Sequence, residues 1–300
     1  MDREKASVPS AALRGALWMG GAMLSFALMA VAARELLHSL GNFEILFLRS
    51  LVALLVLIAL LPRFGWGALR TRLFGLHVLR NLLHFGGQYA WVYALAFLPL
   101  ATVFAIEFTM PVWTALLAML LLGERLNFGR AVMLSLGLAG ILIILKPGVG
   151  PLQPAALVML VGSFAYASMN IATKRLSADD STFAVLFYMA AVQAPLGLLL
   201  ALPDWIAPGD AELAWILVLG GCGLSAHFCL TRAFRIADAM VVAPIDFLRL
   251  PLIAVVGLLF YGEPLDLTIL FGAAVMFTGT WFCIARESRT LPKPGTDHGL

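Results

Sequence analysis

Apolar residues fill most of this chain in ten long runs, which are separated by short polar or charged breaks. The runs cover residues 13–33, 43–61, 74–97, 100–122, 130–146, 155–173, 183–202, 213–234, 239–260 and 267–285. Each run is near the roughly 20 apolar residues that an α-helix needs to cross a bilayer. The pattern therefore predicts an all-α polytopic membrane protein with ten transmembrane helices.

The first half of the chain recurs in the second half at a fixed offset. Ile106-Glu107-Phe108 returns 139 residues later as Ile245-Asp246-Phe247, and Gly123-Glu124 returns at the same offset as Gly262-Glu263. Matches of this kind at one offset indicate an internal repeat. A repeated membrane unit with an acid at the corresponding place in each copy is typical of transporters.

The odd number of spans in each unit fixes how the two units enter the membrane. Residues 1–150 form the first five-helix repeat. Residues 151–285 form the second, which must enter from the opposite side of the bilayer. We therefore expect two inverted repeats related by a pseudo-two-fold axis in the membrane plane. Transporters built in this way bind their substrate near the midplane, where the repeats meet.

The distribution of Lys and Arg predicts the orientation. With the N-terminus inside, the cytoplasmic segments hold fifteen of these residues, whereas the outer loops hold only Arg34 and Lys146. Short cytoplasmic loops carry an excess of Lys and Arg, so we expect both termini in the cytoplasm. Residues 286–300 are polar and contain Pro292 and Pro294, which predicts a disordered cytoplasmic tail.

Composition and motifs exclude several other classes of function. The chain is 62% hydrophobic and 12% charged, whereas soluble proteins have about 25% charged residues, so no sizeable soluble domain remains outside the spans. It lacks the G-x-x-x-x-G-K-[ST] loop of ATP-driven proteins and the H-E-x-x-H and G-x-S-x-G motifs of hydrolases. The His and Cys residues follow no metal-ligand spacing. We expect no catalytic residue, metal, cofactor or nucleic-acid partner.

Charged residues also lie inside the spans, where a charge that faces lipid costs roughly 2.5–3.5 kcal/mol on insertion scales. Asp246 and Arg249 are three residues apart and can pair on one helix. This pair is either structural or faces a wet cavity and meets the substrate. Glu107 has no opposite charge within one helical turn, so it either pairs with a distant Arg or rests protonated. Glu107 and Asp246 are therefore possible proton-coupling acids, with a helix-tying role as the alternative.

Uncharged polar residues also fall inside the spans. Asn81, His84 and Gln88 recur at spacings of three and four, which places them on one face of the third helix. Any one of them alone would serve hydrogen bonding between helices, whereas the set predicts the lining of a cavity. The candidate substrate-binding residues are Asn81, His84, Gln88, Tyr89, Trp113, Tyr166, Asn170, His227 and Arg249.

Two further arginines and two prolines stand out within the spans. We interpret Arg49 as an interface and packing residue near the outer end of the second span. For Arg80, snorkelling to the inner face and a functional role are equally good explanations. Pro111 and Pro251 follow the two acids and interrupt their spans. Bends at these prolines could act as gates, although proline kinks also occur in transmembrane helices without gating.

Two copies of one sequence element carry a family resemblance. The first copy runs from Tyr93-Ala94-Leu95 through Pro111 to Gly123-Glu124-Arg125-Leu126, Gly137 and Gly140. The second runs from Arg232-Ala233-Phe234 through Pro251 to Gly262-Glu263-Pro264-Leu265 and Gly279. With the repeat over about residues 13–285, these motifs make the chain resemble the EamA-like ten-helix members of the drug/metabolite transporter (DMT) superfamily.

The resemblance implies a secondary transporter of the bacterial inner membrane that works by alternating access through a central cavity. Amino-acid export is common in the family, so we expect export of aromatic or other apolar amino acids, or of similar amphipathic compounds. One alternative is a nucleotide-sugar or phosphorylated-sugar exchanger, and another is an intramembrane enzyme acting on lipid-linked substrates. The expected partners are a small-molecule substrate and the lipid bilayer, with the protein monomeric or homodimeric.

Overall fold

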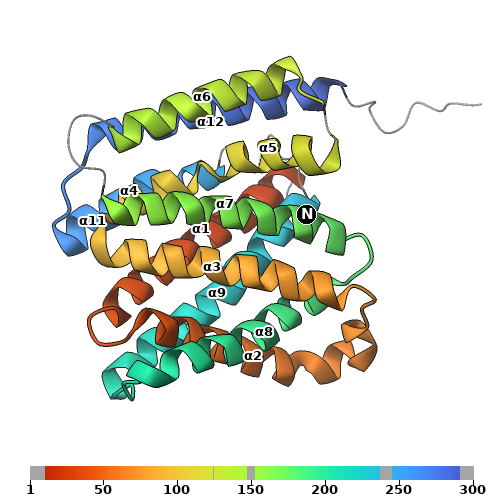
Figure 1. Cartoon of the computed structure of the whole chain (residues 1–300), viewed down its shortest axis with the longest axis vertical. Helices are drawn as coiled ribbons and strands as arrows, with labels where there is room; N and C mark the ends of the chain where they lie inside the picture. Colours follow the sequence, from red (N-terminus) through yellow and green to blue (C-terminus); the bar gives the residue numbers. More distant parts are fainter. Residues whose placement is uncertain (1–10, 124, 147–152, 237–244, 291–300) are drawn as a thin grey trace, which may run out of the picture.

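The computed structural model describes residues 11–123, 125–146, 153–236 and 245–290, and every regular element within them is a helix (Figure 1). Two short 3-10 helices, η1 (Trp66–Leu69) and η2 (Leu202–Asp204), lie in connections. The main helices are α1 (Ala11–Leu36), α2 (Asn42–Phe64), α3 (Phe74–Phe97), α4 (Leu100–Glu107), α5 (Met110–Leu122), α6 (Phe128–Leu145), α7 (Pro154–Leu176), α8 (Thr182–Ala201), α9 (Asp210–Ile236), α11 (Arg249–Tyr261) and α12 (Leu267–Thr290).

These helices confirm the predicted all-α membrane architecture. Within the described ranges, eight helical segments are long and apolar enough to cross a membrane. α3 has the length of a span but carries five buried polar side chains, those of His77, Arg80, Asn81, His84 and Gln88. The ninth predicted span, 239–260, begins outside the described residues and continues in α11.

The C-terminal helix is longer than the sequence suggested. Disorder was expected from residue 286 onward, yet α12 continues to Thr290. The reason is local, because Arg and Glu are good helix formers and simply extend the last turns. Residues 291–300, the rest of the predicted tail, lie outside the described part of the chain.

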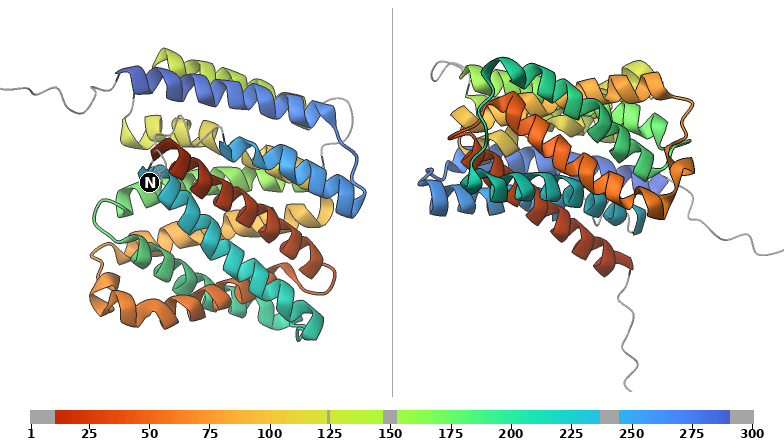
Figure 2. Two further views of the ribbon diagram at one scale, coloured as in Figure 1. Left: turned by 180° about the vertical axis from the view of Figure 1, so that it is seen from behind. Right: turned by 90° about the horizontal axis from the view of Figure 1, so that it is seen from below.

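The two repeats interlock, so that each helix packs chiefly against a helix of the other repeat. α1 lies along α9 and α3 lies along α7, and these pairs are equivalent because α1 corresponds to α7 and α3 to α9. α2 packs on α8, and α6 packs on α12 at the opposite end of the molecule (Figure 1). Figure 2 shows α1 and α9 side by side on the face opposite α3 and α7. This packing has the symmetry of two inverted repeats.

Glycines allow the paired helices to approach closely. A side chain at Gly140 of α6 would overlap Met276 of α12. A Cβ atom at Gly279 would lie 2.9 Å from the Cβ of Leu136. Small residues at crossings are how membrane helices gain van der Waals contact without a hydrophobic driving force. Two glycines of the family motif, Gly140 and Gly279, therefore serve the α6–α12 pair.

The fourth span is a broken helix, and a turn at Leu248 interrupts the ninth at the corresponding place. α4 ends at Glu107 and α5 begins at Met110, so the span expected at 100–122 is interrupted next to Pro111, as the proline in the sequence predicts. Pro111 explains the break, because a proline lacks the backbone N–H and its ring would collide with the carbonyl four residues earlier. It is tolerated only in the first turn of α5. In the second repeat Pro251 again lies in the first turn of α11, so each proline follows closely on an acid.

A glutamate of the second repeat ties down two helices of the first. Gly262 adopts the left-handed φ of 62° and ends α11. The next residue, Glu263, accepts a 2.7 Å hydrogen bond from the N–H of Leu100, the first residue of α4. Its other carboxylate oxygen lies 3.2 Å from Arg34 at the end of α1. Carboxylates are stabilised at helix N-termini, so Glu263 holds α1 and α4 together. Its repeat counterpart, Glu124, lies outside the described residues.

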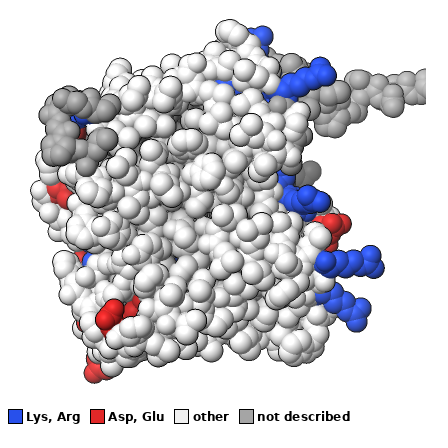
Figure 3. All heavy atoms as spheres, viewed as in Figure 1, with Lys and Arg blue, Asp and Glu red and all other residues white. Residues whose placement is uncertain are grey.

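Charged residues gather at the two ends of the helices. Figure 3 shows Lys and Arg along the edge where α1 begins, and Asp and Glu mainly along the opposite edge. The connection between α2 and α3, which holds Arg70 and Arg72, lies at the first edge, and the connection between α8 and α9 lies at the second (Figure 1). Asp204 is in η2 of that second connection, and Asp210 begins α9. This polarity agrees with the Lys and Arg bias in the sequence, on which the prediction of cytoplasmic termini rests.

Candidate functional site

Arg249 forms a buried ion cluster with two carboxylates. The residue is only 3% exposed at the start of α11. One of its guanidinium nitrogens lies 3.2 Å from the carboxylate of Glu107 at the end of α4, and another lies 3.7 Å from Asp246. The direct pairing expected for Asp246 and Arg249 is present. Glu107 pairs with a distant Arg, which is the first of the two alternatives that its sequence position left open.

Aromatic rings enclose this ion cluster. The carbon of the Arg249 guanidinium lies 4.6 Å from the ring centre of Phe26, 5.0 Å from that of Phe104 and 5.1 Å from that of Phe108. Ring faces attract cations at these distances. Phe108 also stacks on Phe247, with ring centres 4.4 Å apart. These two phenylalanines are equivalent at the 139-residue offset, so the two proline-containing spans meet at the pseudo-two-fold axis.

The charge balance of the cluster is uneven. Glu107 and Asp246 are repeat-equivalent, but the position that corresponds to Arg249 in the first repeat holds Met110. Two carboxylates therefore share one guanidinium. With both acids ionised the cluster carries one net negative charge, and with one proton bound it is neutral. Because net charge is expensive within a membrane, the cluster is suited to take up one proton or one cationic group.

His84 on α3 belongs to a second group of buried polar side chains. Its ring nitrogens lie 3.2 Å from the amide nitrogen of Gln88 and 3.0 Å from that of Gln193 on α8. Gln193 also donates a 3.2 Å hydrogen bond to the main-chain carbonyl of Asn81. The structure thus brings Asn81, His84 and Gln88 together. Within the described residues, Oε1 of Gln88 and Nδ2 of Asn81 have no hydrogen-bond partner, which leaves one acceptor and one donor available.

His227 on α9 connects the two groups. Its ring packs edge-on against His84, with ring centres 5.7 Å apart, and against Phe26 at 5.9 Å. Phe26 in turn covers Arg249. Tyr166 of α7 lies on another side of His84, with ring centres 5.7 Å apart. Side chains from both repeats therefore form one continuous candidate site between them.

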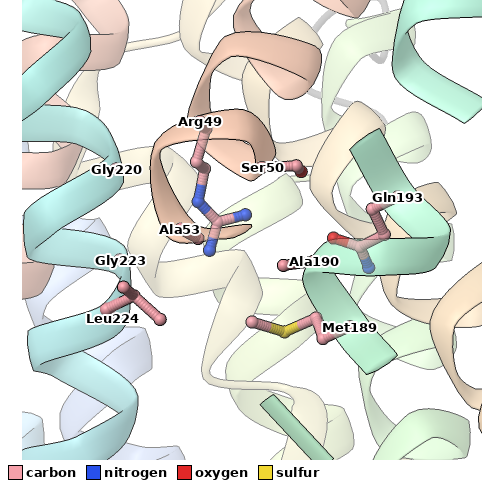
Figure 4. Close-up of a pocket in the computed structure, with 9 residues that line it drawn as sticks. All are labelled: Arg49, Ser50, Ala53, Met189, Ala190, Gln193, Gly220, Gly223 and Leu224. Atoms are coloured by element: carbon pink, nitrogen blue, oxygen red, sulfur yellow. The ribbon is translucent and has the colours of Figure 1, made fainter. Parts of the chain in front are cut away.

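Two arginines lie deeper than the sequence suggested. Arg80 is 4% exposed and donates hydrogen bonds to Asn81 at 2.7 Å and to Thr173 of α7 at 3.1 Å. It does not snorkel, because α7 packs over it. Arg49, which we interpreted as an interface and packing residue, is 8% exposed and points into a pocket between α8 and α9 (Figure 4). Among the described residues, no carboxylate pairs with either arginine.

Three predicted lining residues make their described contacts elsewhere. Tyr89 stacks on Phe43 of α2, with ring centres 4.8 Å apart. Trp113 of α5 packs edge-on against Phe164 of α7, and the amide of Asn170 lies 3.2 Å from the sulfur of Met110. Tyr89 follows Gln88 directly, so it points about 100° away around the helix. Trp113 lies beyond the break in its span, so its depth in the sequence does not place it at the site.

Some residues of the site are not among the candidate binding residues named from the sequence. Gln193 carried a usable signal, because an amide inside an apolar run needs a hydrogen-bond partner. The sequence gave little signal for Phe26, Phe104 and Phe108, because twenty phenylalanines are spread over this apolar chain. No group of three potential metal ligands among His, Cys, Asp and Glu occurs within the described residues.

The pocket beside Arg49 is small in this conformation. Its volume is about 10 Å³, and on the same measure a cavity needs roughly 10–15 Å³ to hold one water molecule. A larger hollow of about 390 Å³ lies between the ends of α4, α6, α11 and α12. At its rim Lys146 donates a 2.7 Å hydrogen bond to Asp266 and lowers the pKa of that carboxyl to about 2. Because the pocket beside Arg49 is so small, a substrate group can enter it only if the helices around it move.

Comparison with known sequences gives consistent matches over nearly the whole chain. The model of the EamA-like transporter family matches residues 13–146 and again residues 153–285. The chain is 31% identical over 279 residues to the S-adenosylmethionine uptake transporter of Rickettsia prowazekii (strain Madrid E), covering 93% of this chain and 95% of that protein.

Two further relatives carry different names. The chain is 31% identical over 283 residues to the riboflavin transporter of Vibrio cholerae serotype O1, covering 92% of this chain and 95% of that protein. It is 29% identical over 268 residues to the pseudopaline exporter CntI of Pseudomonas aeruginosa (strain UCBPP-PA14), covering 88% and 92%. A crystal structure superposes with a TM-score of 0.65 at 19% identity, covering 92% of this chain and 98% of that chain, which shows the fold alone.

Proposed function

The chain belongs to the EamA-like transporter family, and we propose that it carries an amphipathic metabolite with an amino-acid end and an aromatic or other apolar end. Family membership makes it a multi-pass membrane transporter of small molecules. We propose that the substrate crosses between the two repeats by alternating access. The observation that supports this most is the junction of the repeats, where Arg249 meets two equivalent acids within a ring of phenylalanines.

The chemistry of the site suits such a substrate. S-adenosylmethionine is an amino acid joined to an aromatic base, and riboflavin is a flat heteroaromatic compound. Small-molecule sites combine apolar and aromatic walls with a few convergent polar groups. Phe26 and Phe108 offer ring faces, while Glu107 and Asp246 offer carboxylates for an ammonium group. We propose that the apolar part of the substrate lies against these rings, with its cationic group towards the acids.

The two acids also support a proposal for energy coupling. When the site opens to water on one side, Glu107 and Asp246 can lose a proton, and when it closes, one proton restores neutrality. Exchange of a substrate for a proton would drive export under an inward proton gradient. We propose this coupling for a protein of the bacterial inner membrane with both termini in the cytoplasm.

A phosphorylated-sugar exchanger is the second candidate. It is favoured by one observation, because Arg49 and Arg80 are both buried without a carboxylate partner among the described residues. The site departs from that chemistry at its centre, where Arg249 is paired with two acids. The family and the names of the relatives favour transport over the alternative of a lipid-modifying enzyme.

Transport by purified protein in proteoliposomes tests the proposal. The panel is L-tryptophan, L-phenylalanine, S-adenosylmethionine, riboflavin and glucose 6-phosphate, each measured inward and outward with and without a pH gradient. We expect saturable movement of one or more of the three compounds with an amino-acid end, which are L-tryptophan, L-phenylalanine and S-adenosylmethionine. Movement of riboflavin alone would contradict the amino-acid end of the proposed substrate. Movement of glucose 6-phosphate alone would establish the second candidate, and movement of none of the five would contradict the proposed substrate class.

A further inference from the structure

We propose that Arg49 is the anion-binding residue of this transporter and holds the carboxylate of the substrate in the pocket between α2, α8 and α9. This inference rests on the proposed function and makes it more specific. It names the part of the substrate that is recognised and the residue that recognises it. Sequence patterns had given Arg49 only an interface and packing role.

The charge of Arg49 is buried and has no partner within the described residues. The Arg49 side chain is more than nine-tenths buried, and a guanidinium stays protonated in proteins. Arg249 has two carboxylate partners and Arg80 has hydrogen bonds to Asn81 and Thr173. Within the described residues, Arg49 has no hydrogen bond or ion pair from its side chain. An unpaired buried cation is strongly unfavourable, so packing alone does not account for a charge at this position.

The shape of the pocket leaves room for the guanidinium of Arg49. Figure 4 shows the guanidinium directed into it, with Met189 and Gln193 of α8 on one side and Gly223 of α9 on the other. A Cβ atom at Gly223 would lie 3.0 Å from Nε of Arg49. Any larger residue at this position would therefore push against the guanidinium. Small residues also line the rest of the pocket, at Ser50, Ala53, Ala190 and Gly220. The surroundings are built to admit the guanidinium and leave its fork of donors facing the pocket.

The Arg49 pocket is connected to the group of polar side chains around His84. Gln193 lines the Arg49 pocket and also lies 3.0 Å from a ring nitrogen of His84. His84 in turn meets Gln88, whose Oε1 has no partner among the described residues. Arg49 thus offers a fixed cation for the carboxylate of a zwitterion, while Glu107 and Asp246 take its ammonium group as proposed above. One guanidinium fork binds one carboxylate through two parallel hydrogen bonds. Its single positive charge neutralises a carboxylate but not a doubly charged phosphate, and this favours an amino-acid carboxylate.

The test compares ligands that differ only in the carboxylate. Binding of L-tryptophan and of tryptamine, which lacks the carboxylate, is measured on the full-length purified protein. If the transport panel identifies S-adenosylmethionine instead, its decarboxylated form replaces tryptamine. We expect the acid to bind wild type at least about tenfold more tightly than the amine, the difference that charge-assisted hydrogen bonds supply. Equal binding of the two would overturn the assignment.

Variants of Arg49 provide the second arm. Arg49→Gln should bind L-tryptophan about tenfold more weakly or worse, and Arg49→Lys should fall between, because it keeps the charge but loses the fork. The matched control is Arg63→Gln, which removes the same charge from an exposed position on the same helix and should bind like wild type. If the role of Arg49 is purely structural, replacing it should lower the melting temperature of the protein without substrate. We expect Arg49→Gln to melt at the same temperature or higher, because an unpaired buried charge is removed.

The outcomes separate this inference from the proposed function. If wild type transports L-tryptophan or S-adenosylmethionine and Arg49→Gln transports it equally well, the function stands and the role of Arg49 is wrong. If inorganic phosphate protects wild type but not Arg49→Gln against unfolding while the amino acids do not, the carboxylate assignment fails and the phosphorylated-sugar candidate gains. Protection by chloride alone would likewise overturn the assignment to substrate. If no carboxylate binds wild type and none is transported, both proposals fall.

Discussion

At the scale of single residues, Arg249 joins the two repeats. It follows the acid of its own repeat by one helical turn and binds the equivalent acid of the other repeat. Neither acid has another cationic partner within ion-pair distance among the described residues. The stability of the junction therefore depends on one guanidinium and on the protonation of two carboxylates.

The first prediction follows from this dependence. Arg249→Met leaves two buried carboxylates without a cation, and breaking a buried pair in this way costs about 3–5 kcal/mol. Adding Glu107→Gln and Asp246→Asn removes the stranded charges, so the triple variant should regain most of the lost stability while remaining inactive in transport. Thermal unfolding in detergent measures both. A triple variant as unstable as Arg249→Met would show that hydrogen bonds, and not charge balance, hold the junction.

The second prediction concerns proton coupling. Glu107→Gln keeps the size of the side chain and an oxygen that can accept the hydrogen bond from Arg249, but it cannot release a proton. We expect this variant to exchange substrate across a proteoliposome membrane and to fail to concentrate it against a pH gradient. If wild-type transport does not respond to an imposed pH gradient, the acids are structural and the protein is a facilitator.

Residue patterns in the sequence identified part of this site. The helical spacing of Asn81, His84 and Gln88 and the cost of charges within spans led directly to side chains that the structure brings together. The same reasoning gave too little weight to Arg49, because nothing in a single sequence shows that a charge near the end of an apolar run will be covered by α8 and α9. Contacts between helices distant in sequence decide such cases.

At the scale of the elements, the crossings of paired helices depend on glycine. The third prediction compares Gly140→Leu with Gly20→Leu. A side chain at Gly140 would collide with Met276, whereas nothing lies within 4 Å of a Cβ atom at Gly20. We expect overpacking at Gly140 to cost about 1–3 kcal/mol and to lower the melting temperature, while Gly20→Leu changes it little. Equal melting temperatures for the two variants would mean that α6 and α12 do not pack as described.

The helices were predictable here, and so was an interruption at Pro111, but its extent was not. The run 100–122 is long enough for one span, yet the structure divides it into two separate helices, α4 and α5. α3 illustrates the reverse, since its polar residues make it the least apolar of the long helices while its neighbours bury them. Hydrophobic patterns therefore located the elements, whereas the chemistry of the site lies where those patterns are interrupted.

At the scale of the whole molecule, the inverted repeat and the charge distribution make one topological claim. Lys and Arg gather at one end of the helices and Asp and Glu mainly at the other (Figure 3). The fourth prediction places single cysteines at Arg70 and at Pro208 in a variant that lacks Cys222, Cys229 and Cys283. A membrane-impermeant thiol reagent applied to intact cells should label position 208 but not position 70. Labelling of both from the outside would contradict the proposed orientation.

The repeat was visible in the sequence because the matching residues stand at one constant offset, and five spans per unit then required inversion. How the units interlock was not visible. The pairing of α1 with α9 and of α3 with α7 depends on surfaces that only three-dimensional packing defines. It is this interlocking that places residues of both repeats around one centre.

The most direct test of the central claim, that substrate crosses at the junction of the two repeats, is counterflow of the identified substrate in proteoliposomes. Wild type is compared with His227→Leu, at the contact between the polar group and the Phe26-covered cluster, and with His38→Leu, an exposed histidine outside the spans. The account predicts that His227→Leu inserts and folds normally but exchanges substrate at least about tenfold more slowly, equivalent to about 1.4 kcal/mol of lost interaction. His38→Leu should exchange like wild type. Counterflow by His227→Leu at the wild-type rate would contradict a central pathway through this site.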